Sequence, residues 1–377
     1  MKNIAYVTGT RADFGIITPL LKKIEQSSDC KLQLFATGMH LVPEFGQTVD
    51  LVKEKFPTLK IIDVKTDNKD KNGMAVFAGK FLNKVVDEFK KERPDLVLVH
   101  GDRVEMFCTA LASFYLNLPI VHTQGGDKTT TWDDSARHAI TKLAHLHFPA
   151  TENSAERIKK MGEEEWRIQI VGTLGLDAVF SVNTLSRREL FQKLGLIYDS
   201  KIILVLLHPV SEQLDNGREH MKIVLNAVKR FNLPTVIVYP NTDSGSDQII
   251  EEINKQKSNP LFKVFENLDY ETFISLEKEA DCWVGNSSAG VVESASFKTP
   301  VVNVGSRQTG REKGINVIDT EYSEDEIYQA INKSLNDQIF LKSLELCINP
   351  WGDGKATERI MRVLESITID SKLLTKS

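Results

Sequence analysis

Cysteine is scarce in this 377-residue sequence, and the spacing of its few cysteines excludes two kinds of architecture. A zinc site needs closely spaced pairs of ligands, and a disulfide framework needs an even set of cysteines in a small secreted chain. The sequence has no CxxC pair, and its cysteines lie far apart, at Cys30, Cys108, Cys282 and Cys347. We therefore expect four reduced cysteines that serve mainly in packing, and no metal site.

A long hydrophobic run is also missing. The longest aliphatic stretch, residues 202–207, is far too short to cross a bilayer. The amino terminus has a strand pattern and a charged loop where a signal peptide would have its apolar segment. A net charge of -5 leaves no basic face for nucleic acid or anionic lipid. We expect a cytoplasmic protein that binds neither membranes nor nucleic acid.

Two common nucleotide-binding fingerprints are absent. The loop at 8–15 contains glycines but no GxGxxG pattern, so evidence for a dinucleotide is weak. The segment GSRQTGR at 305–311 spaces two glycines like a Walker A loop but lacks Gly-Lys-Ser/Thr, which excludes an ATPase of that class. The loop at 8–15 precedes a predicted helix and suits an anionic group, and the planar guanidinium of Arg11 suits a phosphate.

Apolar runs alternate with amphipathic segments along the whole chain, which predicts an α/β protein. The length suits two domains of about 150 to 200 residues each. Continuous apolar runs indicate strands buried on both faces of parallel sheets. We predict two Rossmann-like, doubly wound domains over 1–175 and 176–354, a final helix in 355–377, and an active site in the cleft between the domains. The predicted strands are 4–7, 32–36, 96–99, 119–122, 168–171, 201–207, 235–239, 282–284 and 300–304.

Polar residues follow two neighbouring strands of the first predicted sheet. Gly101 permits a sharp turn that leaves Asp102 and Arg103 at the carboxyl end of one strand. Gln124 and Asp127 follow the next strand along the chain. Open α/β sheets bind their ligands at the carboxyl ends of strands, so we expect these side chains to share a site.

A helix is predicted to begin near Asp133 and Asp134. Asp133 with Arg137, and Asp134 with His138, are spaced four residues apart and are expected to stack on its first turns. One interpretation is that the carboxylates only cap the helix and complement its dipole. We favour a functional site, because caps rarely take the form Asp-Asp-x-x-Arg-His beside two other polar strand ends.

Two histidines follow predicted strands. His40 is either a substrate contact or a loop histidine, and its position alone leaves both interpretations open. His208 stands before Pro209, where it can donate a ring proton to a phosphate or serve a structural role.

The loops of the second half carry polar groups suited to a diphosphate. Asn241 follows the predicted strand 235–239 in the sequence PNTDSG. GNSSAG at 285–290 runs into a predicted helix at 291–297, so glycines, the hydroxyls of Ser287 and Ser288, and helix-start amides come together. The alternative is a turn with a helix cap and no ligand.

These motifs together resemble the hydrolysing UDP-N-acetylglucosamine 2-epimerases, over almost the whole chain. The resemblance rests on HGDR at 100–103, GGD at 125–127, DDSARHAITKLAHLHF at 133–148, HPV at 208–210, YPNTDSG at 239–245, and GNSSAG with GSRQTGR at 285–311. It implies a GT-B fold whose last helix crosses back onto the first domain, and a homodimer or homotetramer. It also implies the reaction of UDP-N-acetylglucosamine with water to N-acetylmannosamine and UDP, the entry step to sialic acid synthesis.

The resemblance further implies roles for individual residues. The carboxylates of the first domain, with Arg137, would face the sugar, and groups of the second domain, with Arg11, would bind UDP. UDP leaves as negative charge develops on it, which amides, arginine and histidine stabilise. Removal of the C2 proton and later delivery of a proton to the other face need carboxyl groups near the ring. A glycal intermediate is expected, with no cofactor. The implied sugar-facing or catalytic residues are Asp102, Asp133, Asp134, Arg137, Gln124, Asp127 and His208, and the implied substrate- or UDP-binding residues are Arg11, His40, Arg103, Asn241, Ser287, Ser288, Glu293 and Arg307.

One residue departs from the family pattern. Many relatives carry an acidic residue at the position of Gln124, and an amide can neither take nor give the proton. Either Asp127, Asp133 or Asp134 covers that role, or the accepted sugar differs, for example a UDP-linked 2,4-diacetamido-2,4,6-trideoxyhexose of a legionaminic acid route. A GT-B glycosyltransferase and a non-catalytic UDP-sugar-binding protein remain as alternatives.

Overall fold

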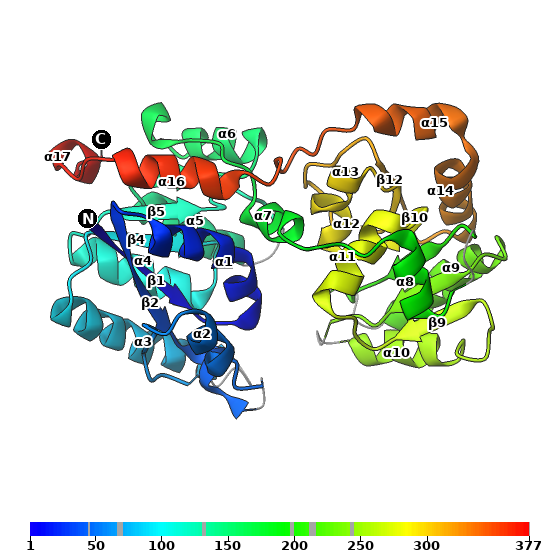
Figure 1. The fold of residues 1–377 in the computed structure, drawn as a ribbon, viewed down its shortest axis with the longest axis horizontal. Helices are drawn as coiled ribbons and strands as arrows, with labels where there is room; N and C mark the ends of the chain where they lie inside the picture. The colour runs from blue at the N-terminus through cyan, green and yellow to red at the C-terminus, as the bar shows by residue number, and fades with distance from the viewer. Residues whose placement is uncertain are drawn as a thin grey trace. The chain divides into compact units, whose positions relative to one another are not determined.

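The chain forms two compact units in the computed structural model, each built around its own parallel sheet (Figure 1). The first unit comprises Met1–Phe180 and Trp351–Ser377, and the second comprises Ser181–Pro350. The structure describes residues 1–43, 46–65, 71–129, 133–196, 200–210, 216–241 and 245–376. Both sheets have six strands and parallel pairing throughout the described residues, so the prediction of two doubly wound α/β sheets is confirmed.

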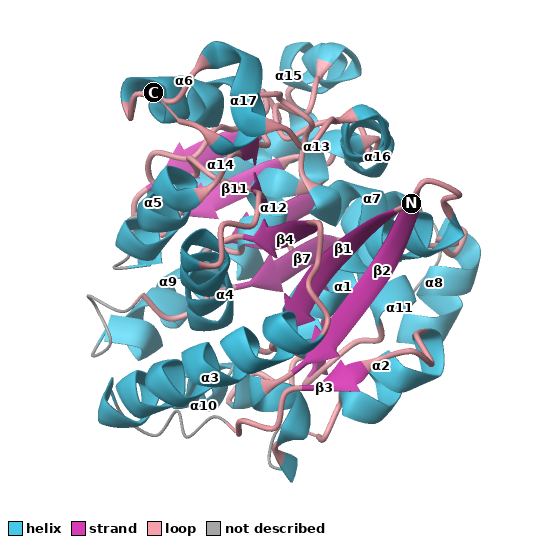
Figure 2. Ribbon diagram, turned by 90° about the vertical axis from the view of Figure 1, so that its left-hand side faces the viewer, coloured by secondary structure: helices cyan, strands magenta, loops and turns pink. Residues whose placement is uncertain are grey.

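The first sheet has the strand order β3-β2-β1-β4-β5-β6. Figure 2 shows β1 and β2 side by side, and they pair in register from Lys2 with Cys30 to Thr8 with Ala36. The predicted closing strand at 168–171 is wrong, because Ile168 makes only an isolated bridge to His147. The edge strand is instead three residues long, too short for a periodic pattern. The bounds are β1 Lys2–Thr8, β2 Cys30–Ala36, β3 Lys60–Ile61, β4 Leu96–His100, β5 Ile120–Thr123 and β6 Leu146–Phe148.

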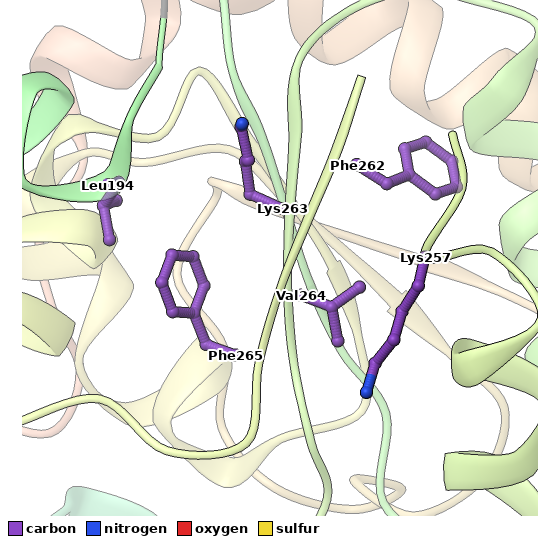
Figure 3. Close-up of a pocket in the computed structure, with 6 residues that line it drawn as sticks. All are labelled: Leu194, Lys257, Phe262, Lys263, Val264 and Phe265. Carbon is purple, nitrogen blue, oxygen red and sulfur yellow. The ribbon is translucent and has the colours of Figure 1, made fainter. Parts of the chain in front are cut away.

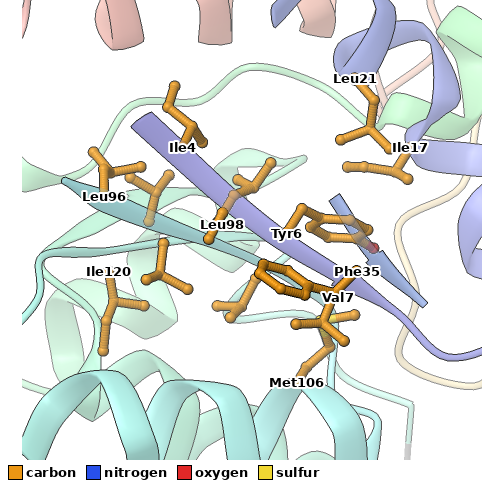
Figure 4. Close-up of a cluster of buried hydrophobic side chains, with 14 of the residues drawn as sticks. Ile4, Tyr6, Val7, Ile17, Leu21, Phe35, Leu96, Leu98, Met106 and Ile120 are labelled. Atoms are coloured by element: carbon orange, nitrogen blue, oxygen red, sulfur yellow. The ribbon is translucent and has the colours of Figure 1, made fainter. Parts of the chain in front are cut away.

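Helices cover the first sheet on both faces, which explains why its central strands are apolar along their length. Side chains of β1 and β4, such as Tyr6 and Leu98, are fully buried between these layers (Figure 4). Each large apolar side chain buried in this way stabilises the fold by about 1.5 to 3 kcal/mol. The helices are α1 Arg11–Gln26, η1 Gly38–Leu41, α2 Val49–Lys55, α3 Lys71–Lys91, α4 Val104–Tyr115, α5 Asp133–Leu143, α6 Glu152–Lys160, η3 Glu165–Arg167, α7 Leu174–Phe180, α16 Ala356–Ser366 and α17 Ser371–Leu374.

The last long helix of the chain packs within the first unit. α16 contacts α1 and α7, and its apolar stripe includes the fully buried Ile360 and Leu364. Asp177 of α7 accepts hydrogen bonds from the first amides of α16, at 3.0 Å from Ala356 and 2.7 Å from Thr357. A carboxylate at the amino end of a helix also complements the helix dipole.

The second sheet has the order β12-β11-β10-β7-β8-β9. Its four inner strands follow the predicted apolar runs, whereas β9 and β12 are partly exposed edge strands that lack such runs. No helix in the described ranges is long and apolar enough to cross a membrane. The elements are α8 Arg187–Leu194, β7 Ile203–Leu206, α9 Gly217–Lys229, β8 Thr235–Val238, α10 Ser246–Asn254, β9 Phe262–Phe265, α11 Tyr270–Glu279, β10 Cys282–Gly285, α12 Ser288–Val292, α13 Ser294–Phe297, β11 Val301–Val304, β12 Val317–Thr320, α14 Glu324–Asn336, α15 Gln338–Ser343 and η5 Leu344–Leu346.

Candidate active site

The turn after β4 places Asp102 at the carboxyl end of the first sheet. Gly101 has a φ of 70°, in the left-handed region that glycine adopts without strain. Its carbonyl accepts a hydrogen bond from His122 Nε2 at 2.8 Å, and His100 Nδ1 lies 2.8 Å from Thr123 Oγ1. Burial lowers the pKa of His100 to about 4 and that of His122 to about 3. Both rings are therefore neutral near pH 7 and hold the turn in place.

Arg137 brings together the polar groups that were predicted from three separate loops. It is buried, and its guanidinium pairs with Asp102 and with Asp134, the latter at 3.0 Å. It also donates a hydrogen bond to the backbone carbonyl of Asp127 at 2.8 Å. The two carboxylates and the guanidinium form one network at the carboxyl ends of β4 and β5, which we call the Arg137 network.

The ion pair that the structure shows on this helix has i,i+3 spacing, where i,i+4 was predicted. Arg137 pairs with Asp134, three residues before it. Asp134 is drawn toward the preceding loop, because its carboxylate accepts hydrogen bonds from the amide and hydroxyl of Thr129, at 2.9 and 2.7 Å. Asp134 therefore has two roles, because it binds the preceding loop at Thr129 and also pairs with Arg137. The predicted alternatives, a helix-start carboxylate and a site residue, do not exclude each other at this position.

The loop Gly125–Asp127 is fixed by contacts with the start of α6. Gly126 has a φ of 78°, and a Cβ there would lie 2.3 Å from the carbonyl oxygen of Ser154. The Ser154 hydroxyl donates to the Asp127 carboxylate at 2.7 Å, and Arg157 donates to the Gly126 carbonyl at 2.6 Å. Glycine is required at this close approach of two backbones.

The turn after β1 differs from its prediction. α1 begins at Arg11, so the loop is shorter than the predicted 8–15. Asp13 forms a capping box with Thr10, and its carboxylate accepts hydrogen bonds from the amides of Gly9 and Thr10, both at 3.1 Å. The amides of Gly9 and Thr10 in the predicted anion-binding turn are therefore already engaged by the chain itself. Arg11 remains as an exposed cation at the first position of the helix.

His40 lies inside the first unit. Its ring is fully buried, with Nε2 3.0 Å from the Thr8 hydroxyl and Nδ1 2.7 Å from the Thr48 hydroxyl. Burial lowers its pKa to about 4. The geometry favours the structural interpretation of His40, because both ring nitrogens are already engaged. Nearby, Arg103 pairs with the buried carboxylate of Glu105 at 3.2 Å.

Asn286 joins three loops at the carboxyl end of the second sheet. Its side chain accepts a hydrogen bond from the amide of His208 at 2.7 Å and donates to the carbonyl of His208 at 2.9 Å. Its own carbonyl accepts from Arg307 at 3.2 Å and from Gln308 at 2.9 Å. The ends of β7, β10 and β11 are thereby tied together around one buried amide side chain.

The ring of His208 is oriented by the next loop. The amide of Asn241 donates to His208 Nδ1 at 3.2 Å. An accepting Nδ1 places the proton of a neutral imidazole on Nε2, so this ring presents a donor on its other side. The rest of the predicted loop, residues 242–244, lies outside the described residues.

The segment after β10 is less regular than predicted. In place of one helix at 291–297, two short helices, α12 and α13, meet at Glu293. Gly285 has a φ of 151°, and a Cβ there would lie 1.9 Å from the carbonyl oxygen of Leu206 on β7. Ser287 takes the N-cap position of α12 without making a side-chain cap hydrogen bond, and Ser288 is the first residue of that helix. Because α12 has only five residues, its dipole contributes less than a long helix would.

A separate hollow of about 420 Å³ lies at the edge of the second sheet (Figure 3). It is centred on β9, which β7 and β8 separate from β10 in the strand order. It is therefore distinct from the loops around Asn286. Its lining residues are Leu194, Lys257, Phe262, Lys263, Val264 and Phe265.

Comparison with known proteins identifies the family. The family model described as UDP-N-acetylglucosamine 2-epimerase matches residues 22–365. The chain belongs to the UDP-N-acetylglucosamine 2-epimerase family. Its members are enzymes that act on UDP-sugars, in agreement with the predicted resemblance.

Relatives in this epimerase family carry names with different sugars. The chain is 39% identical to a UDP-N,N'-diacetylbacillosamine 2-epimerase (hydrolyzing) of Legionella pneumophila, over 100% of this chain and 99% of the relative. It is 33% identical to a GDP/UDP-N,N'-diacetylbacillosamine 2-epimerase (hydrolyzing) of Campylobacter jejuni, over 99% and 97%. It is also 33% identical to a UDP-N-acetylglucosamine 2-epimerase of Neisseria meningitidis, over 97% and 96%.

Solved structures of similar proteins confirm the fold class. The chain matches the UDP-GlcNAc 2-epimerase from Neisseria meningitidis bound to UDP-GlcNAc with a TM-score of 0.79, at 20% identity over 97% of this chain and 99% of that chain. It matches the S. aureus MnaA-UDP co-structure with a TM-score of 0.77, at 24% identity over 97% and 96%. Both units of the chain therefore have the α/β sheets of the GT-B fold.

Gln124, which follows β5, has a strained backbone conformation. Its φ of 58° is left-handed, a conformation that costs a non-glycine residue of order 1 kcal/mol or more. Its side-chain amide donates to the Thr173 hydroxyl at 2.6 Å. The side-chain amide of Gln124 is thus held by a neutral partner, and an amide can neither take nor give a proton in catalysis.

Several residues that organise the candidate site were not predicted from the sequence. His122 and Thr123 hold the turn after β4, Ser154 holds Asp127, and Asn286 and Gln308 connect the loops of the second unit. Asn286 has a sequence signal, since it follows a buried strand and a glycine. The others depend on contacts between residues distant in sequence.

Proposed function

We propose that the chain is a hydrolysing 2-epimerase that converts a UDP-linked 2-acetamido sugar and water into UDP and the free sugar epimerised at C2. The observation that carries this proposal is the Arg137 network, which holds two carboxylates at the carboxyl end of a sheet in a UDP-sugar epimerase family. A reaction that moves protons at C2 needs carboxyl groups that are positioned but can change partners.

We infer that the preferred sugar is N,N'-diacetylbacillosamine, a 2,4-diacetamido-2,4,6-trideoxyhexose. The support is the relative of that name, which is 39% identical over the whole chain. UDP-N-acetylglucosamine is the second candidate, supported by the Neisseria meningitidis relative at 33% identity. Both sugars carry the 2-acetamido group and the C2 proton on which the chemistry depends.

The second unit would bind the leaving nucleotide. Ser287 and Ser288 with the first amides of α12 would hold the diphosphate, Glu293 would accept the ribose hydroxyls, and His208 and Arg307 would donate to phosphate oxygens. These donors stabilise the negative charge that develops on UDP as its bond to C1 breaks. Arg11 and Arg103 of the first unit, and Asn241, are further candidates for substrate contacts.

The first unit would carry the proton transfers. A base removes the C2 proton as UDP leaves, which gives a glycal. Water then adds at C1, and a carboxyl group delivers a proton to the opposite face of C2. Gln124 cannot take part, so we assign these steps to Asp102 with Asp133 or Asp134, and Arg137 orients them. Asp127 is the remaining candidate.

The test is incubation of the purified protein with each UDP-sugar in heavy water, followed by proton NMR. We expect UDP and a 2-epimerised free sugar that carries deuterium at C2, because elimination discards the original proton and hydration takes one from solvent. We expect a higher kcat/KM with the diacetamido substrate. A product that keeps its C2 hydrogen would exclude elimination, and transfer only in the presence of an acceptor sugar would favour a glycosyltransferase. We also expect the protein to be cytoplasmic and to form a homodimer or homotetramer. Light scattering of the purified protein measures the number of subunits.

Replacement of Arg307 with alanine is expected to weaken UDP binding by about 1.5 to 3 kcal/mol, the usual value of a hydrogen bond to a charged group. Arg307 donates to the Asn286 carbonyl in the second unit, which places its guanidinium beside the candidate diphosphate loop. Isothermal titration calorimetry with UDP measures the change. Arg188→Ala, an exposed arginine of α8 in the same unit, is the matched control and should bind as the original protein does. Equal affinity of the Arg307 variant would remove Arg307 from the site.

A further inference from the structure

The second unit contains a buried carboxyl group that the proposed reaction does not use. Glu277 of α11 is fully buried, and within the described residues neither of its carboxyl oxygens has a hydrogen-bond donor. α11 packs against α13, and the carboxyl group that faces Glu277 is that of Glu293, at the junction of α12 and α13. An ionised carboxylate buried in this way, without a donor or a cation, is strongly unfavourable.

Among the described residues, no cation is seen to compensate a charge on Glu277. Burial, followed by the charge of Glu293, raises the pKa of Glu277 well above its ordinary value. Burial, followed by the charges of Glu293 and Glu277, raises the pKa of Tyr270 on the same helix, and its neutral hydroxyl contributes no positive charge. α13 itself has no charged side chain. The charged side chains that α8 turns to this region are paired elsewhere, Arg187 with Glu279 and Asp281, and Lys193 with Asp269.

Two neighbouring carboxyl groups in a buried place favour a state in which one of them is protonated. Two carboxyl groups can form a hydrogen bond only when one of them is protonated and donates. Burial raises the pKa of Glu293 to about 7, and the neighbouring Glu277 carboxyl opposes that rise. The proton belongs to the pair, and the more deeply buried Glu277 retains it when the pair has a single negative charge.

We propose that Glu277 is a positioning residue for the nucleotide: its protonated carboxyl donates a hydrogen bond to the Glu293 carboxylate and keeps Glu293 ionised and oriented to accept the ribose hydroxyls. This inference rests on the proposed function, in which Glu293 binds the ribose. Glu293 is partly exposed and can reach a ligand, whereas Glu277 is closed to solvent and can act only through Glu293.

The test is the pH dependence of UDP affinity, measured by calorimetry from pH 5.5 to 9.5. Only ionised Glu293 accepts both hydroxyls, so affinity should be full above its folded pKa of about 7 and fall by up to about tenfold per pH unit below it. Glu277→Gln retains a hydrogen-bond donor, so its UDP affinity should fall over the same acidic pH range, which we call the acid limb of the profile. Glu277→Met removes the donor, which should move the acid limb to higher pH by about one unit, so that affinity at pH 7 falls about tenfold and recovers at pH 8.5.

A second arm uses the alkaline side of the profile. The original protein should lose affinity when Glu277 itself ionises, whereas Glu277→Gln cannot ionise and should retain it. This comparison does not need Glu277→Met, so it remains valid even if that variant fails to fold. Circular dichroism would reveal such a failure. Titration of the phosphates and uracil of UDP affects all the proteins equally.

The outcomes separate the two proposals. If the original protein binds no UDP, or if Glu293→Gln binds it equally well at every pH, the proposed nucleotide site is wrong. If the original protein binds UDP through Glu293 but its pH profile coincides with those of both Glu277 variants, Glu277 is only a packing residue and this inference is overturned.

Discussion

Replacement of Asp102 with asparagine is expected to lower kcat at least about a hundredfold while UDP binding is retained. The amide has nearly the same shape as the carboxyl and can still accept a hydrogen bond from Arg137, but it cannot take or return the C2 proton. Loss of a general acid or base usually costs a factor of about 10² to 10⁴. UDP release under saturating substrate measures kcat, and calorimetry with UDP measures binding.

Asp95→Asn is the matched control for this variant. Asp95 precedes the same strand, β4, at its other end, where its exposed carboxylate accepts hydrogen bonds from the backbone amide and the side chain of Asn3. We expect it to retain normal turnover. If Asp102→Asn also turns over normally, the proton transfers belong to Asp127, Asp133 or Asp134 alone.

Replacement of Arg137 with methionine is expected to lower the free energy of unfolding by about 3 to 5 kcal/mol and to abolish turnover. The side chain of Arg137 is only 7% exposed, and it is paired with Asp102 and Asp134, which are 21% and 16% exposed. Removing one member of a buried ionic network leaves the remaining charges without compensation, which explains the size of the effect. Urea unfolding followed by circular dichroism gives the stability, and UDP release gives the activity.

Arg218→Met provides the comparison, because Arg218 pairs with Glu251 on the surface, with side chains 54% and 58% exposed. Solvent-exposed pairs contribute about 0 to 1 kcal/mol, so this variant should unfold close to the original protein. Equal urea midpoints for the two variants would show that the Arg137 network adds no stability. Its role would then be limited to the orientation of the carboxylates.

The long, buried strands were predictable from local sequence because short, continuous apolar runs bounded by turn residues are typical of strands buried on both faces of a parallel sheet. The runs at Leu96–His100 and Ile203–Leu206 are examples. The short edge strand Leu146–Phe148 was missed, and a strand was wrongly predicted at 168–171. Three residues carry too little periodicity, and pairing at an edge depends on a partner elsewhere in the chain.

The helix boundaries also divide into features that local sequence predicted and features that it missed. The sequence indicated a helix after the first strand but placed its start too late, because the capping box of Thr10 and Asp13 was not recognised. It predicted one helix at 291–297, where the chain forms two that meet at Glu293. Glu293, at that junction, interacts with the buried Glu277 of α11, and spacing along the chain does not reveal an interaction between separate helices.

The sequence by itself determined the α/β class, the family, and the loops that carry the polar groups, because strand ends with Gly-Asp-Arg or Gly-Asn-Ser-Ser leave their polar side chains at the edge of a sheet. The tertiary structure alone decided which of these groups interact. It paired Arg137 with Asp102, 35 residues away, and with Asp134, and it enclosed His40. It also placed Asn286 between three strand ends. Charge pairing and burial depend on distance in space, and the fold sets that distance by bringing the carboxyl ends of separate parallel strands to one edge.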